Sequence, residues 1–186
     1  MSREIILENT LKTIMTEKEI HSYLSYELTG NDEIFLKEVI NEVLRKLPAN
    51  AFNCGLSSAL LGAMILDNSS IPVSVISGHL DYSTKRIFNC YNPIPYSTEK
   101  IYINEIWDGH CWVEINNLII DISIFRTIYN GKVSNDLYDK IISQFGKGRG
   151  ALLGSPKEIQ KLGFDYIPCY GLTQNQISGL IRGIDS

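Results

Sequence analysis

Three residues of this chain could together carry out nucleophilic chemistry: Cys54, His110 and Asp121. A cysteine thiolate attacks carbonyl carbon readily, and a neighbouring imidazole can take up the thiol proton and later return it. A carboxylate beside the imidazole fixes its tautomer and stabilises its protonated form. These residue types predict acyl transfer through a thioester, provided that folding brings the three side chains together.

Two strands joined at Asn116-Asn117 are expected to position His110 and Asp121, because asparagine tolerates the positive φ values of two-residue turns. If Ile115 pairs with Leu118, His110 and Asp121 become diagonal neighbours on one face, roughly 7 Å apart at the backbone. The other face is then apolar and suited to the core. It holds Cys111, Val113, Ile115, Leu118, Ile120 and Ile122.

Residues 54–66 are apolar almost all the way round, which predicts a central helix buried on nearly every side. Asn53 is a candidate N-cap, which would leave Cys54 in the first turn, where the helix dipole favours a thiolate. The backbone N–H of Cys54 is a candidate oxyanion-hole donor, with Asn53 or Asn50 as the side-chain contributor. We expect Trp112 to pack against the wall of the site, among the residues that bind the oxyanion or the substrate. Glu114 is expected to be a solvated or sheet-edge charge.

These segments resemble the transglutaminase-like branch of the papain-like cysteine enzymes, in which a Cys at the start of a buried helix precedes a Gly-His-Ala-Trp-Val-Glu-Val strand and a strand carrying Asp. The matching segments are Asn53-Cys54-Gly55, Gly109-His110-Cys111-Trp112-Val113-Glu114-Ile115 and Ile119-Ile120-Asp121. The resemblance covers residues 50–125. It implies that Cys54, His110 and Asp121 are catalytic, that the substrate is a peptide or protein, and that no cofactor is essential.

The chain departs from the family pattern in two places. Cys111 stands where the family usually has Ala, which is harmless if that side chain faces the core. The spacing from Cys54 to His110 is also longer than the compact family core needs. Residues 80–108 are therefore expected to be an inserted lid or substrate-shaping loop, although a plain exposed connection explains them equally well. The aromatic residues and prolines of this segment suit contacts to a peptide; they are Tyr82, Phe88, Tyr91, Pro93, Pro95, Tyr96 and Tyr102.

Other motifs compete less well. His79 and Asp81 form a second histidine–acid pair, but they lie where a strand is expected to end. The stretch 146–150, Gly-Lys-Gly-Arg-Gly, lacks the full phosphate-binding pattern and indicates a loop. Cys90 and Cys169 have no visible partners. An arylamine-acetylating enzyme is disfavoured because Arg-Gly-Gly-x-Cys is missing before Cys54.

The rest of the chain predicts an α+β fold in one domain, residues 1–186, with a papain-like core of one central helix on an antiparallel sheet. Residues 1–50 are helical in pattern, with Asn31 as a candidate N-cap and Pro48 as the end. Strands are expected at 71–77, 100–107, 110–115 and 118–125 within the catalytic core, 51–125. Residues 126–186 return to helix, with capping boxes at 155–158 and 173–176.

Composition and charge argue against several classes of function. The 186 residues carry a net charge of −4, which argues against nucleic-acid binding, and no segment has the length of a membrane span or the character of a signal peptide. The four cysteines lack metal-site spacing, so we expect no metal and reduced thiols in a cytoplasm, either the cell's own or one into which the protein is delivered. The expected function is that of a protease, glutamine deamidase or transglutaminase. The alternative is a catalytically silent module that binds a peptide or protein. The oligomeric state stays open.

Overall fold

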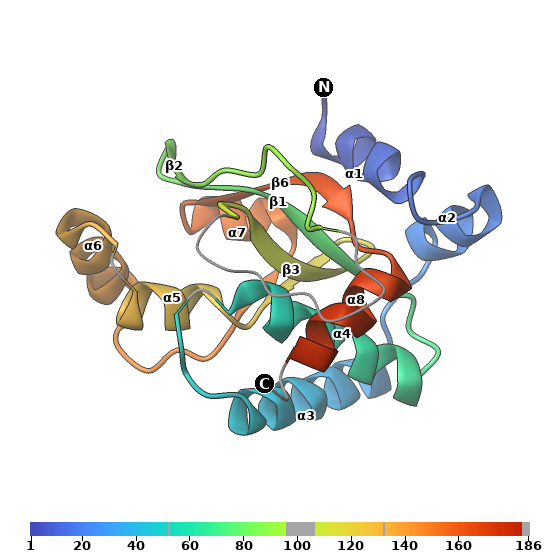
Figure 1. Ribbon diagram of the computed structural model, residues 1–186, viewed down its shortest axis with the longest axis horizontal. Coiled ribbons are helices and arrows are strands. Elements are labelled where there is room, and N and C mark those ends of the chain that lie inside the picture. Colours follow the sequence, from blue (N-terminus) through green and yellow to red (C-terminus); the bar gives the residue numbers. More distant parts are fainter. Residues whose placement is uncertain (52, 96–106, 132, 184–186) are drawn as a thin grey trace.

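The fold is α+β, built on one antiparallel sheet with helices on both of its faces (Figure 1). The computed structural model describes residues 1–51, 53–95, 107–131 and 133–183. These residues form eight helices and six strands: α1 (Arg3–Leu11), α2 (Glu17–Leu24), α3 (Gly30–Lys46), α4 (Cys54–Asn68), β1 (Ser74–Tyr82), β2 (Lys85–Phe88), β3 (His110–Ile115), β4 (Leu118–Asp121), α5 (Ile124–Asn130), α6 (Asn135–Phe145), β5 (Leu152–Gly154), α7 (Pro156–Lys161), β6 (Phe164–Gly171) and α8 (Gln174–Arg182).

Strand β1 organises the sheet, because three strands pair with it. The strand order is β2-β1-β3-β4-β5, and β6 also pairs with β1. The first half of β1 pairs with β3, where Gly78 faces His110, and the second half pairs with β2, where Leu80 faces Phe88. Gly78 and Leu80 are two residues apart and so share a face of the strand. This arrangement brings Phe88 and His110 together as neighbours along β1.

Two hydrophobic clusters hold the sheet between layers of helices. One lies between the sheet and helices α3, α4 and α8, and it includes Cys54 and Cys111. The other lies on the opposite face, among helices α1, α2, α5, α6 and α7, and it includes Trp112 and Tyr166. Figure 1 shows α3, α4 and α8 gathered on one side of the sheet. Strand β3 is consequently buried along its whole length.

The predictions for helices are largely confirmed. The central helix runs from Cys54 to Asn68 as α4, and its predicted N-cap, Asn53, makes no side-chain capping bond. The predicted capping boxes begin α7 and α8. Asn31 is not an N-cap, because Thr29 caps α3 and exchanges hydrogen bonds with Asp32. Among the described residues, no helix has both the length and the apolar character that crossing a membrane requires.

The predictions for strands need more correction. The strand expected at 71–77 is β1, which begins at Ser74 and continues to Tyr82, so the first part of the expected lid belongs to the β1–β2 hairpin. The strand expected at 118–125 ends at Asp121, and residues 100–106 of another lie outside the described residues. Strands β5 and β6 were not expected, since residues 126–186 were assigned to helix.

Candidate active site

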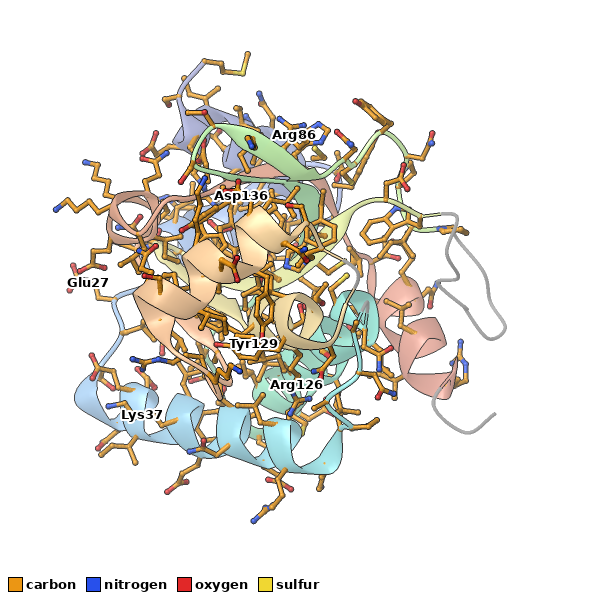
Figure 2. All side chains as sticks on the ribbon, turned by 90° about the vertical axis from the view of Figure 1, so that its left-hand side faces the viewer. Glu27, Lys37, Arg86, Arg126, Tyr129 and Asp136 are labelled. Atoms are coloured by element: carbon orange, nitrogen blue, oxygen red, sulfur yellow. The ribbon has the colours of Figure 1, made fainter. Side chains whose placement is uncertain are left out.

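Cys54 lies at the first position of α4, where backbone N–H groups lack helical acceptors. The segment before it is anchored by Arg126 of α5, which donates hydrogen bonds to the carbonyl oxygens of Leu44, Leu47 and Pro48. Figure 2 shows Arg126 between α5 and the end of α3. Arg126 therefore fixes the end of α3, from which the chain continues toward Cys54.

The structure brings His110 and Asp121 together, as the hairpin register predicts. The observed pairs include Ile115 with Leu118, and Asn116 takes a positive φ of 46° in the turn. His110 Nε2 lies 2.6 Å from Asp121 Oδ2, and both side chains are fully buried. A carboxylate at this distance fixes the ring so that Nδ1 is left for another partner.

Asp121 is held by more than the histidine. Tyr166 of β6 donates its hydroxyl to Asp121 Oδ2 over 2.7 Å. The other oxygen, Oδ1, accepts from the backbone N–H and hydroxyl of Ser123 and from the N–H of Ile124. These bonds cap the start of α5, which explains why the strand expected at 118–125 stops at Asp121.

The Cys54 sulfur faces this pair. It lies 4.0 Å from the carbonyl oxygen of Gly109, the residue before β3, and it interacts with the side chains of Cys111 and His110. His110 Nδ1 is buried and makes no full hydrogen bond within the described residues. Contacts of this kind are often long in an empty enzyme and tighten when substrate binds.

Electrostatics favour an ion pair between Cys54 and His110. The pKa of Cys54 is well below its usual value because the Cys111 thiol donates to it and because the positive charge of the neighbouring His110 favours the thiolate, which together outweigh burial. Burial lowers the pKa of His110, but Asp121 and Cys54 outweigh it and raise the pKa to about 10. The pKa of Asp121 is lowered against burial, mainly by His110. Both shifts favour a thiolate beside an imidazolium.

The candidate site is closed. Cys54 is 5% exposed and His110 0%. The Phe88 ring stacks on His110 with centroids 4.8 Å apart. Trp107 lies against Gly109 and donates its Nε1 to the Asn92 carbonyl. Phe88 therefore covers the histidine, and we term residues 88–92 the cover segment. The rest of the predicted insertion, 96–106, is outside the described residues.

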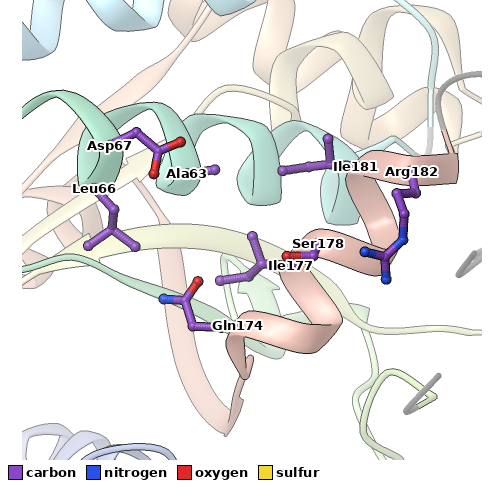
Figure 3. Close-up of a pocket in the computed structure, with 8 residues that line it drawn as sticks. All are labelled: Ala63, Leu66, Asp67, Gln174, Ile177, Ser178, Ile181 and Arg182. Atoms are coloured by element: carbon purple, nitrogen blue, oxygen red, sulfur yellow. The ribbon is translucent and has the colours of Figure 1, made fainter. Parts of the chain in front are cut away.

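Neither of two surface pockets is lined by Cys54, His110 or Asp121. One, of about 430 Å³, lies between α4 and α8 (Figure 3). The other, of about 320 Å³, lies between the β1–β2 hairpin and α6, and Phe88 is part of its lining. The Phe88 ring thus contacts both the second pocket and His110.

The remaining predicted site residues are more dispersed. Asn53 is half-buried directly before Cys54, and Asn50 is exposed. Trp112 is fully buried and donates its Nε1 to Glu114. Glu114 is not a solvated charge: it is fully buried, and Arg3 binds both of its oxygens, at 2.9 and 2.7 Å. An acidic side chain in a buried strand needs such a partner.

The competing motifs find other partners. His79 Nδ1 accepts from the backbone N–H of Cys90, and Asp81 pairs with Arg86, so these two do not form a histidine–acid dyad. Residues 146–150 form a loop after α6, as expected. Within the part of the chain that the structure describes, no three His, Cys, Asp or Glu side chains are grouped so that they could hold a metal ion.

Sequence reasoning missed Tyr166 and Arg3, since nothing local marks a residue whose partner is 45 or 111 positions away. The alternation of buried residues along β6 was the available signal for Tyr166.

Comparisons with protein-family models, curated proteins and solved structures find no match to this chain.

Proposed function

We propose that this chain is a cysteine-dependent acyl-transfer enzyme with a papain-like, transglutaminase-like core. The observation that carries the proposal is the arrangement of Cys54, His110 and Asp121: a carboxylate 2.6 Å from the imidazole, and a thiol with a lowered pKa at a helix start on the other side. Activated thiols of this kind occur where a cysteine must act as a nucleophile.

The proposed reaction proceeds in two steps. The Cys54 thiolate attacks an amide carbonyl carbon, and the tetrahedral oxyanion accepts from the Cys54 backbone N–H and from the side chain of Asn53 or Asn50. The His110 imidazolium protonates the leaving amine as the carbon–nitrogen bond breaks, which leaves a thioester. The acceptor then gives its proton to His110, attacks the thioester and releases Cys54.

The acceptor determines the activity. Water would make the chain a peptidase or a glutamine deamidase, and a lysine amine would make it a transglutaminase. The substrate proposed from the family resemblance is a peptide or protein. Because Cys54 is nearly inaccessible, the cover segment has to move before any substrate of this size reaches it.

A product assay tests the proposal. The full chain is incubated with peptides that contain glutamine, with and without a primary amine, and the mixture is analysed for ammonia, cleaved peptide and amine-linked peptide. We expect one of the three products, and we expect it to disappear in Cys54→Ser. The matched control is Cys169→Ser, which leaves the candidate site unchanged. Product formation that persists in Cys54→Ser would overturn the proposed role of Cys54.

The second candidate is a catalytically silent module that binds a peptide or protein. The observation that favours it is the complete burial of His110 beneath Phe88. The two candidates differ in turnover: the silent module binds a peptide equally well with Cys54 or Cys54→Ser and releases no product. A covalent thioester on Cys54, seen by mass spectrometry after acid quenching, decides for the enzyme.

A further inference from the structure

Cys90 and Cys169 lie next to each other beside β1, so the expectation that they have no partners is wrong. The backbone N–H of Cys90 donates to His79 Nδ1 over 2.8 Å, and its thiol contacts Ser77. Cys169 is the extra residue of a bulge in β6, opposite Ser77 and Gly78. Both thiols therefore lie over the same part of β1, close enough for each to shift the pKa of the other.

The two thiols differ in chemistry. The pKa of Cys169 is lowered to about 7, chiefly by a hydrogen bond from Cys90 and also by the N–H of His79 and the charge of Arg86. Cys169 is only partly buried, whereas Cys90 is buried and its pKa is raised. Cys169 is thus the thiolate that a dissolved oxidant meets first, with Cys90 beside it as the second thiol.

Cys90 belongs to the cover segment and Cys169 to strand β6, so the two thiols lie where the segment meets the sheet. Cys90 lies two residues after Phe88, whose ring stacks on His110. The next residue, Tyr91, accepts a hydrogen bond at its carbonyl oxygen from Tyr170 of β6, over 3.1 Å. Non-covalent contacts therefore already hold Cys90 and Tyr91 against β6, and a covalent bond from Cys90 to β6 would prevent this segment from lifting.

We propose that Cys90 and Cys169 form a reversible disulfide bond that locks the cover segment against β6 and so keeps Phe88 over His110. With glutathione disulfide as oxidant, the Cys169 thiolate attacks one glutathione sulfur and releases one glutathione thiolate. Cys90 then loses its proton and attacks the Cys169 sulfur, which forms the protein disulfide and releases the second glutathione thiolate. Two protein thiols are oxidised and one glutathione disulfide is reduced; the proton that Cys169 lost on becoming a thiolate and the proton that Cys90 loses go to the two released glutathione thiolates. The bond itself stands on this geometry; its effect on activity rests on the proposed function.

Cys54 and Cys111 also interact with each other. They differ from Cys90 and Cys169 in how easily a dissolved oxidant reaches them. Cys54 is 5% exposed and Cys111 0%, so a reagent of the size of glutathione does not reach either sulfur in the closed structure. Thiol–disulfide exchange requires such access in addition to a thiolate. Oxidation is therefore expected at Cys169 and Cys90.

Disulfide mapping tests the bond. The reduced full chain is treated with excess glutathione disulfide, quenched in acid and digested without reductant. We expect the Cys90 and Cys169 peptides to be joined and lighter by two hydrogen atoms than the separate thiol peptides. In Cys90→Ser, we expect glutathione to remain attached to Cys169. A bond between Cys54 and Cys111 in place of this one, or Cys90 and Cys169 both left as thiols, would overturn the inference.

Alkylation of Cys54 tests the closing role. Reaction with iodoacetamide, followed at the Cys54 peptide, should slow at least about tenfold in the oxidised chain and recover on reduction, because the reagent needs the local opening that the bond blocks. The same oxidant should leave the rate unchanged in Cys169→Ser. A linked chain whose Cys54 reacts as fast as before would refute the lock. If Cys54 fails to react even in the reduced chain, the result counts against the proposed enzyme. Whether the disulfide bond forms is decided separately, by the disulfide mapping.

Discussion

Asp121 shows how one buried carboxylate can serve three elements. Its Oδ2 accepts from His110 of β3 and Tyr166 of β6, and its Oδ1 caps the start of α5 through Ser123 and Ile124. Because a buried charge is costly unless hydrogen bonds satisfy it, these contacts stabilise both the carboxylate and the imidazolium beside it. The orientation of His110 therefore depends on residues far from it in the sequence.

Tyr166→Phe should lower stability without abolishing the ion pair. A hydrogen bond to a charged group contributes about 2 kcal/mol, and the His110–Asp121 bond remains in the variant. We expect a loss of about 2 kcal/mol in the free energy of unfolding in urea, with Cys54 still reactive near pH 6. The matched control is Tyr82→Phe, which removes a neutral bond to Gln144 and should cost about 1 kcal/mol. Equal losses in the two variants would contradict the role given to Tyr166.

The raised pKa of His110 makes stability depend on pH. A histidine whose pKa rises on folding, here to about 10, stabilises the fold fully below its ordinary pKa of about 6.5, and this stabilisation is lost as pH rises through about 10. The substitution Asp121→Asn removes the main cause of the shift. In a Cys54→Ser background, which excludes thiol titration, the loss of stability that Asp121→Asn causes should be larger near pH 6 than near pH 10. A loss that stays constant over that range would rule out the charged pair.

Among the elements, the β1–β2 hairpin is the one placed to limit access to His110, because Phe88 contacts both His110 and the pocket beside α6. Phe88→Ala should make Cys54 more accessible to large reagents. We expect the ratio of the alkylation rate of a bulky maleimide to that of iodoacetamide to rise at least about tenfold, since the ring is the gate.

Ile87→Ala is the matched control, since Ile87 lies on the same strand and lines the same pocket. It should leave the ratio of the two rates unchanged. If the ratio stays the same in Phe88→Ala, or rises as much in Ile87→Ala, then reagents enter by another route.

The sequence allowed the local elements to be predicted and left the long-range ones hidden. The β3–β4 register could be predicted because a two-residue turn and alternating side chains determine it within a dozen residues. Strand β6 was missed because Pro168 argues against a strand, and the bulge beside it becomes apparent only once β6 pairs with β1. The cover over the face that carries His110 was equally hidden, since the helices on that face come from both ends of the chain.

At the scale of the whole molecule, an ion pair between Arg3 and the buried Glu114 links helix α1 to strand β3. Arg3 binds both oxygens of Glu114 and also donates to the Tyr166 carbonyl, so the first helix supports the two strands that hold the histidine and the tyrosine. Trp112 supplies the other donor to Glu114. The ends of the chain therefore contribute to the geometry of a site that the family resemblance confines to residues 50–125.

Arg3→Ala should be strongly destabilising, because it leaves the Glu114 carboxylate buried with Trp112 as its remaining donor. Loss of one partner from a buried pair costs about 3 kcal/mol. Urea unfolding measures the effect. Lys12→Ala, which breaks an exposed pair with Glu8 on the same helix, is the control and should cause no measurable change. A similarly small effect of Arg3→Ala would show that Glu114 is satisfied in another way.

The central claim is that Cys54 is a thiolate paired with the His110 imidazolium, and the pH dependence of Cys54 alkylation tests it most directly. In the reduced chain, iodoacetamide should modify Cys54 rapidly near pH 6. In His110→Ala the rate at that pH should fall at least about tenfold and recover only toward the ordinary thiol pKa of about 8.5, whereas His21→Ala, on an exposed part of α2, should match the original chain. A Cys54 that reacts slowly near pH 6, with or without His110, would contradict the account.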